Sequence, residues 1–125
     1  MTTPTLPRVA IIGPCASGKS TLRRALLAHG YDARISAQEH SAVPDLWQRM
    51  EADILIGLQA ELEAVRLRRN DARWSAQIWS LQQERLAPAF AKADYVLDTS
   101  SLSVDAVVSQ VLEFLGGIVQ DSLHE

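Results

Sequence analysis

Apolar residues occur along the chain in two alternating patterns, short continuous runs and longer segments with helical spacing. Residues 8–12 form a short, β-branched apolar run, which is typical of a strand buried on both faces. Residues 53–58 predict a second strand despite Gly57, and residues 95–97 predict a last one. A weaker alternation over residues 31–37 adds a further strand candidate.

Helical periodicity fills the segments between these runs. Residues 19–29 predict a first helix, which Gly30 follows where a left-handed C-cap residue belongs. Pro44 opens a helical turn that runs to Met50, and a helix is expected from about Ala60 to Arg69. After a break at residues 70–72, a long helix is expected from a Ser75 cap to Lys92, with Pro88 either kinking it or splitting it.

The last predicted helix starts after a Ser103 cap. Its apolar residues follow the spacing of a single buried stripe through Leu115. Gly116 and Gly117 are expected to end it, which leaves residues 118–125 as a frayed tail.

The alternation of strands and helices predicts an α/β domain with a mostly parallel sheet of about four strands and right-handed crossovers. No internal repeat, low-complexity stretch or linker divides the chain. We therefore expect residues 1–125 to form a single domain, which agrees with a length of 125 residues.

Composition narrows the class of protein. With 47% hydrophobic and 22% charged residues, the chain has the make-up of an ordinary soluble globular domain. No apolar run approaches the roughly 18 residues of a membrane span, and residues 1–7 lack the pattern of a secretory signal. One cysteine excludes an internal disulfide, so a cytoplasmic location is expected. The net charge of -3 gives no general attraction to nucleic acid.

One motif carries specific chemistry. It matches the phosphate-loop pattern G-x-x-x-x-G-K-[ST] in full, directly after an apolar strand and directly before an amphipathic helix. Its cysteine is read as a small residue at a free position of the motif, with a redox role as the alternative. The residues of the motif are Gly13, Pro14, Cys15, Ala16, Ser17, Gly18, Lys19 and Ser20.

Each position of this motif has a physical task. Gly13 and Gly18 allow backbone conformations in which consecutive N–H groups point at phosphate oxygens, and the following helix adds its own unpaired N–H groups. Lys19 is expected to reach the β- and γ-phosphates, Ser20 to coordinate Mg²⁺, and Thr21 to assist in the first helical turn. ATP and Mg²⁺ are therefore the expected cofactors.

With this motif in place, the chain resembles the P-loop small-molecule kinases, the group that contains shikimate, gluconate and nucleoside monophosphate kinases. The resemblance covers most of the chain and is specific at the loop. It implies a three-layer P-loop NTPase fold. Residues 53–59 and 61–69 look like the family's late strand and its arginine-bearing helix leading to the lid, and residues 93–100 and 102–108 look like the last strand, adenine-side loop and final helix.

Four arginines, Arg66, Arg68, Arg69 and Arg73, fall within eight positions. In the kinases that the chain resembles, one lid arginine clamps the transferred phosphoryl group and another stacks on adenine. Arg66, Arg69 and Arg73 share one face if the helix continues through residues 70–72. Arg69 and Arg73 are thus expected to be catalytic and Arg66 to bind the nucleotide; the alternative is a solvated helix face. For Trp74, the two alternatives are that it covers the base and that it is a packing residue of the fold.

The resemblance also implies a second acidic group near the loop, at the end of a strand. Glu39 follows the strand candidate at residues 31–37, so it is the candidate for the Mg²⁺ shell or for the base that accepts the acceptor's proton. A plain loop carboxylate is the alternative. His40 and Asp45 are candidate substrate ligands beside it. Asp53 lies at the leading end of its predicted strand, and Gln59 stands at the trailing end, where an aspartate is common in the family.

By resemblance, Thr99 and Ser100 belong to the adenine-side loop. The Asn-Lys-x-Asp guanine motif is absent, so ATP is favoured over GTP without excluding GTP.

The substrate-binding segment is shortened. Only about 23 residues separate Gly30 from Ile54. The acceptor site is therefore very small, supplied by another subunit of a homo-oligomer, or absent. The first hypothesis is a kinase acting on a small hydroxyl-bearing metabolite. The alternatives are a nucleotide-binding or NTP-hydrolysing switch module without such an acceptor, and a relic of the fold with weak or no nucleotide binding.

Overall fold

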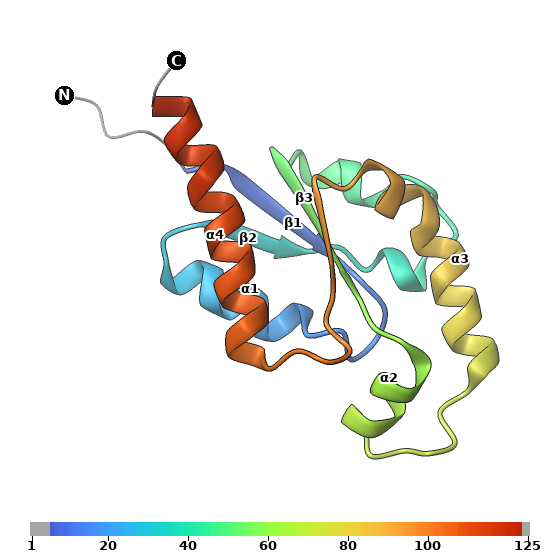
Figure 1. Ribbon diagram of the computed structural model, residues 1–125. Coiled ribbons are helices and arrows are strands. Elements are labelled where there is room, and N and C mark those ends of the chain that lie inside the picture. The colour runs from blue at the N-terminus through green and yellow to red at the C-terminus, as the bar shows by residue number, and fades with distance from the viewer. Residues whose placement is uncertain (1–5, 124–125) are drawn as a thin grey trace.

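The computed structural model describes residues 6–123 as an α/β fold with a four-stranded parallel sheet and four α-helices (Figure 1). Two short 3-10 helices, η1 and η2, lie between the second and third strands. In chain order, the elements are β1 (Arg8–Ile12), α1 (Lys19–Ala28), β2 (Asp32–Ile35), η1 (Gln38–His40), η2 (Leu46–Met50), β3 (Ile54–Gln59), α2 (Leu62–Arg68), α3 (Ala76–Lys92), β4 (Tyr95–Asp98) and α4 (Val104–Leu123).

The strand order in the sheet is β2-β1-β3-β4, and every pair is parallel. Val9 pairs with Ala33 of β2 and with Ile54 of β3, while Ile56 pairs with Tyr95 of β4. Because all strands run in one direction, the segments that follow them begin at the same edge of the sheet. That edge carries the glycine loop after β1, Glu39 after β2 and Thr99 after β4.

Helices cover both faces of the sheet. Figure 1 shows α1 and α4 on one face and α3 on the other. Alternate residues of β1 divide between the two layers: Val9 and Ile11 pack with α1 and α4, whereas Ala10 and Ile12 pack with the α3 side. The predicted apolar run over residues 8–12 is therefore confirmed as a strand buried on both faces.

Gly57 sits in the middle of β3 for a packing reason. A Cβ atom there would lie 2.7 Å from the ring of Phe90 on α3, so the strand needs glycine to let the helix approach. The expectation of a strand across Gly57 is confirmed.

The predicted start or end residue is confirmed for most of the helices. Ser75 Oγ accepts from Ile78 N at 3.1 Å, and α3 then runs unbroken through Pro88, so the proline does not split it. Gly30 has a φ of +89° just past α1, as a left-handed residue at that position should.

The predicted end of the last helix is wrong. α4 continues through Gly116 and Gly117 to Leu123, so residues 118–123 are helical rather than a frayed tail, while residues 124–125 lie outside the described residues. The apolar stripe explains the difference, because Ile118 packs against the same core cluster as Leu115. None of the described helices, including this one of 20 residues, is long and apolar enough to cross a membrane.

The two glycines of α4 give a stability test. A Cβ at Gly116 or at Gly117 would meet no atom within 4 Å, and both residues are exposed. Because glycine is about 1 kcal/mol less favourable than alanine inside a helix, Gly116→Ala and Gly117→Ala should each raise the free energy of unfolding by about that amount. Urea unfolding measures the change. Unchanged stability in both variants would mean that the helix ends before residue 116.

Gly57→Ala is the opposite control. The added methyl group meets the Phe90 ring at 2.7 Å, so the free energy of unfolding should fall by about 1–3 kcal/mol in the same measurement.

Candidate functional site

The loop between β1 and α1 is shaped by two glycines. A Cβ at Gly13 would lie 2.4 Å from the Leu58 carbonyl oxygen and 2.5 Å from Ser17 Oγ, so no larger residue fits. Gly18, the N-cap of α1, has a φ of +103°, a conformation that glycine adopts without steric cost. No side chain caps α1. Its first N–H groups are therefore available to an anion.

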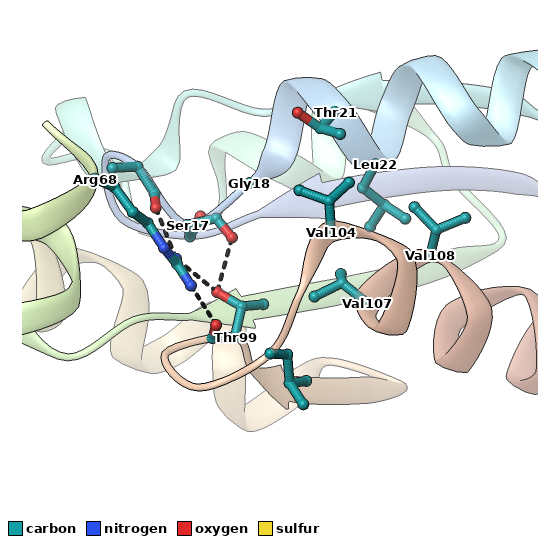
Figure 2. A pocket seen from close by; sticks show the side chains of 11 residues that line it. Ser17, Gly18, Thr21, Leu22, Arg68, Thr99, Val104, Val107 and Val108 are labelled. Atoms are coloured by element: carbon teal, nitrogen blue, oxygen red, sulfur yellow. Dashed lines mark hydrogen bonds between the residues drawn. The ribbon is translucent and has the colours of Figure 1, made fainter.

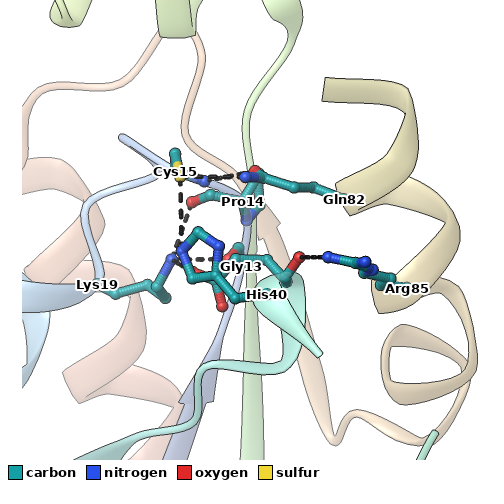
Figure 3. A network of polar contacts seen from close by, with 8 residues as sticks. Gly13, Pro14, Cys15, Lys19, His40, Gln82 and Arg85 are labelled. Atoms are coloured by element: carbon teal, nitrogen blue, oxygen red, sulfur yellow. Dashed lines mark hydrogen bonds and ion pairs between the residues drawn. The ribbon is translucent and has the colours of Figure 1, made fainter. Parts of the chain in front are cut away.

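Lys19 folds back on the loop that carries it. Its Nζ atom donates to the carbonyl oxygens of Gly13 at 2.7 Å and Pro14 at 2.9 Å, and to Glu39 Oε2 at 2.6 Å (Figure 3). The Lys19 side chain is only 11% exposed. An ammonium group has three N–H donors, so these three oxygens use all of them.

Glu39 lies in η1, just beyond the carboxyl end of β2, and its side chain is 4% exposed. One carboxylate oxygen binds Lys19, whereas Oε1 is buried without a hydrogen-bond partner among the described residues. The His40 Nε2 atom lies 3.9 Å from Glu39 Oε2. The structure thus brings Lys19 and Glu39, both predicted to be site residues, into direct contact.

Ser20 and Thr21 lie in the first turn of α1, with Ser20 exposed. Within residues 6–123, no group of three or more His, Cys, Asp or Glu side chains is arranged to hold a metal ion.

Cys15 is hydrogen-bonded to Gln82 of α3. Its backbone N–H donates to Gln82 Oε1 at 3.0 Å, Gln82 Nε2 donates to the Cys15 sulfur at 3.2 Å, and His40 Nε2 lies 3.9 Å from that sulfur (Figure 3). Gln82 is buried. The loop is therefore held by α3 on one side and by Lys19 on the other.

Arg68 and Thr99 join three segments at the opposite end of the loop. Arg68 Nη1 donates to Ala16 O at 2.9 Å and to Thr99 Oγ1 at 3.0 Å, and Nη2 donates to Thr99 O. Thr99 Oγ1 lies within donating distance of Ser17 O at 2.9 Å and Gln59 O at 3.1 Å. The hydroxyl of this buried threonine thus connects the end of β3, the β4–α4 connection and the glycine loop.

A cavity of about 370 Å³ opens beside these contacts (Figure 2). Its polar margin includes Ser17, Arg68 and Thr99, and its remaining wall is mostly apolar and comes from the glycine loop, α1, α4 and the connection before α4. Ser17 Oγ is buried and has no hydrogen-bond partner among the described residues. The apolar wall is formed by Leu22, Leu102, Val104, Val107 and Val108.

Arg66, Arg69 and Arg73 do not share one helical face, because the condition for it is not met. Helix α2 ends at Arg68, so the helix does not continue through residues 70–72. Arg66 donates to Trp74 O at 3.0 Å and to Glu63 Oε1 at 3.1 Å. The Arg69 guanidinium lies 3.9 Å above the Trp74 ring. These contacts hold residues 69–74 as a tight turn rather than aiming arginines at the loop.

Arg73 is exposed, and its backbone N–H donates to Asp71 Oδ1 at 3.0 Å. Trp74 contacts Arg69 and is not among the residues that line the cavity.

The other predicted site residues lie in different parts of the fold. Thr99 lines the cavity, but Ser100 Oγ accepts from Glu61 N at 2.8 Å and so binds the start of α2. Asp53 accepts from Arg8 N at 2.8 Å at the amino end of the sheet, as its leading position implied. Asp45 lies 3.8 Å from Lys92 Nζ.

Sequence reasoning missed the importance of Arg68 and Gln82. Arg68 was one of four clustered arginines, and helical spacing favoured the other three. Gln82 falls on the buried face of α3 with Leu86 and Ala89, and a polar residue on an apolar face is the signal that identifies it.

A scan against protein-family models and a search of curated proteins found no match to this chain.

The Thr99 hydroxyl gives a test of how the site is held together. Thr99→Val keeps the shape but removes the hydroxyl, so Ser17 O loses this donor and Arg68 Nη1 loses an acceptor, while Gln59 O still accepts from Thr99 N. The free energy of unfolding should fall by about 1–3 kcal/mol. Ser101→Ala, at an exposed neighbouring residue, is the matched control and should stay within about 0.5 kcal/mol in urea unfolding. Equal effects in the two variants would contradict this role of Thr99.

Proposed function

We propose that this chain is a P-loop protein of three-layer fold that binds a Mg²⁺–nucleoside triphosphate, ATP by preference, and transfers its γ-phosphoryl group to a small hydroxyl-bearing metabolite in the cytoplasm. The observation that carries the proposal is the uncapped amino end of α1, with Lys19 inside the glycine loop and a cavity beside it. An anion site and a mostly apolar cavity that share Ser17 and Gly18 suit a ligand with phosphates at one end and a flat base at the other.

The phosphates would take the place of oxygens that Lys19 now binds. Gly13 O, Pro14 O and Glu39 Oε2 hold its ammonium group in this structure. The β- and γ-phosphate oxygens offer stronger charge-assisted hydrogen bonds than the two neutral carbonyl groups do. Triphosphate binding would thus be an exchange of partners around a cation that is already in the loop.

The residues at the loop fit Mg²⁺. Ser20 presents a hydroxyl in the first turn of α1, and the unpartnered Glu39 Oε1 is a buried acceptor near Lys19 that suits a metal-bound water. When bound, the ion would neutralise charge on the β- and γ-phosphates. Glu39 would also orient the acceptor and receive the proton of its hydroxyl group.

The base would enter the cavity between the loop and α4. The valines of α4 supply an apolar wall for one of its faces. Arg68 lies at the polar margin with its guanidinium held by Ala16 O and Thr99, and a planar guanidinium fixed in this way suits stacking on a base. Arg68 thus takes the nucleotide-binding role first expected of Arg66.

One observation favours a second candidate, an NTP-hydrolysing switch module. Arg66 and Arg69 are held at Trp74, so neither contacts the loop. A kinase uses such cations to stabilise charge on the transferred group. A partner protein that supplies an arginine to the loop would make hydrolysis conditional on its binding.

Nucleotide binding is tested by thermal melting with Mg²⁺ and ATP. A ligand at 100 times its Kd stabilises the folded state by about 2.7 kcal/mol, so the melting temperature should rise clearly. Lys19→Ala should abolish the rise. Lys92→Ala, which removes an exposed lysine of α3, should keep it and serves as the matched control. The same rise in both variants, or none in the unmodified chain, would reject the proposal.

Glu39→Gln separates the roles of the Lys19–Glu39 pair. The substitution removes the charged competitor for Lys19, so ATP affinity measured without Mg²⁺ by calorimetry should increase about tenfold. Phosphoryl transfer with Mg²⁺ should fall about 100-fold or more, because the proton acceptor is lost. Glu63→Gln is the control for an exposed glutamate. Reduced affinity without Mg²⁺ would contradict competition for Lys19, and acceptor-independent phosphate release alone would favour the switch.

A further inference from the structure

The outward side of α3 carries few charges for a helix surface that faces solvent. Figure 1 shows α3 at the outside of the molecule, on the side of the sheet opposite α1 and α4. Of its exposed residues, only Glu84 and Lys92 are charged, whereas Ile78 and Leu81 are 44% and 42% exposed. The exposed face of a helix normally carries polar and charged side chains, so this face has the composition of a contact surface.

Two grooves lie on this face, and a ridge separates them. The first groove, of about 450 Å³, is lined by α3 alone. The second groove, of about 330 Å³, lies between α3 and residues 41–44. Leu81 and Glu84 line both grooves, so their side chains form the ridge, whereas Arg85 and Pro88 line only the second groove. Helices pack on one another by placing such ridges in such grooves.

The ridge and the second groove carry opposite charges. Glu84 on the ridge and Arg85 in the groove form no ion pair within the part of the chain that the structure describes. Arg85 Nη1 donates to the Glu39 carbonyl oxygen at 3.4 Å, which uses one of the five N–H donors of the guanidinium group. A carboxylate that entered the second groove would therefore meet a guanidinium group with free donors.

Because both charges belong to one face, the face is complementary to itself. Consider two copies of α3 packed antiparallel around a two-fold axis that passes between Glu84 and Arg85. Glu84 of each copy then lies opposite Arg85 of the other, and Leu81 lies opposite Pro88. The ridge of each copy thus enters the second groove of the other, and every contact occurs twice.

We propose that this face is the interface of a homodimer, with the two α3 helices antiparallel and reciprocal Glu84–Arg85 ion pairs beside the two-fold axis. The same axis places the exposed side chain of Ile78 opposite the exposed Ala91, so apolar contacts extend the interface on both sides of the charged centre. None of the residues that line the cavity beside α4 lines either groove. The proposal therefore does not depend on nucleotide binding.

Sedimentation of the full chain at concentrations up to about 300 µM tests the dimer. The unmodified chain should sediment as a dimer at the upper end. Glu84→Arg and Leu81→Asp should each raise the dissociation constant about tenfold or more, because like charges or a buried carboxylate then lie at the interface. Glu113→Arg and Leu27→Asp are the matched controls, at an exposed glutamate of α4 and a 43% exposed leucine of α1, and should leave the dimer intact.

A mixture of two variants tests the pairing itself. Glu84→Arg leaves two positive charges at positions 84 and 85, and Arg85→Glu leaves two negative charges. Neither variant should self-associate well, but an equimolar mixture should form a heterodimer about tenfold or more stable than either homodimer, since each positive pair faces a negative pair. The doubly substituted chain, Glu84→Arg with Arg85→Glu, should dimerise again. A change that merely disturbed the fold would not be restored in this way.

Three results would overturn the proposal. The first is an unmodified chain that sediments as a monomer at every concentration. The second is a dimer that Glu84→Arg and Leu81→Asp leave intact, because the interface would then lie elsewhere on the molecule. The third is a mixture of the two charge variants that associates no more strongly than its components.

Discussion

The parallel pairing of β1 with both β2 and β3 is the constraint on which the rest of the site depends. It places the end of each strand at one edge of the sheet, so that the glycine loop, Glu39 and the Gln59–Ala60 backbone begin side by side. Glu39 is 20 positions from Lys19 in sequence, and Thr99 is 82 positions from Ser17, yet both pairs are in hydrogen-bond contact. A change of register by one residue would turn β1 over and separate these contacts.

The buried ammonium group of Lys19 explains why the loop has a defined conformation. Removing a cation from water is unfavourable unless oxygens replace the water, and here two carbonyl groups and one carboxylate do so. The same three contacts fix the curvature of the loop, because two of the acceptors are its own backbone. The unpaired groups nearby, Ser17 Oγ, Glu39 Oε1 and the first N–H groups of α1, are therefore held at fixed positions rather than formed on binding.

Local sequence patterns predicted the strands, the glycine loop and most helix ends, because each depends on neighbouring residues. Glu39 was also identified, since its position after a strand places it at the same edge as Lys19. The contacts of the arginines could not be predicted from local patterns, because they depend on how the chain turns after α2 and on where Trp74 lies. The end of α4 was misjudged for a related reason: two glycines weaken a helix locally, but Ile118 packing on a distant part of the core outweighs them.

Helix α3 is attached along its length to the segments around the site, with Trp79 at Ala60 and Gln83 at Gln59 in addition to its packing on the sheet. Near the carboxyl end of α3, Phe90 packs over Gly57 in the middle of β3. Near the middle of the helix, Gln82 accepts a hydrogen bond from the backbone N–H of Cys15. The two residues are eight positions apart, roughly 12 Å along the helix axis. A displacement of the loop at Cys15 would therefore act on Gln82 and, through Trp79 and Gln83 of the same helix, on the backbone and side chains at Gln59 and Ala60.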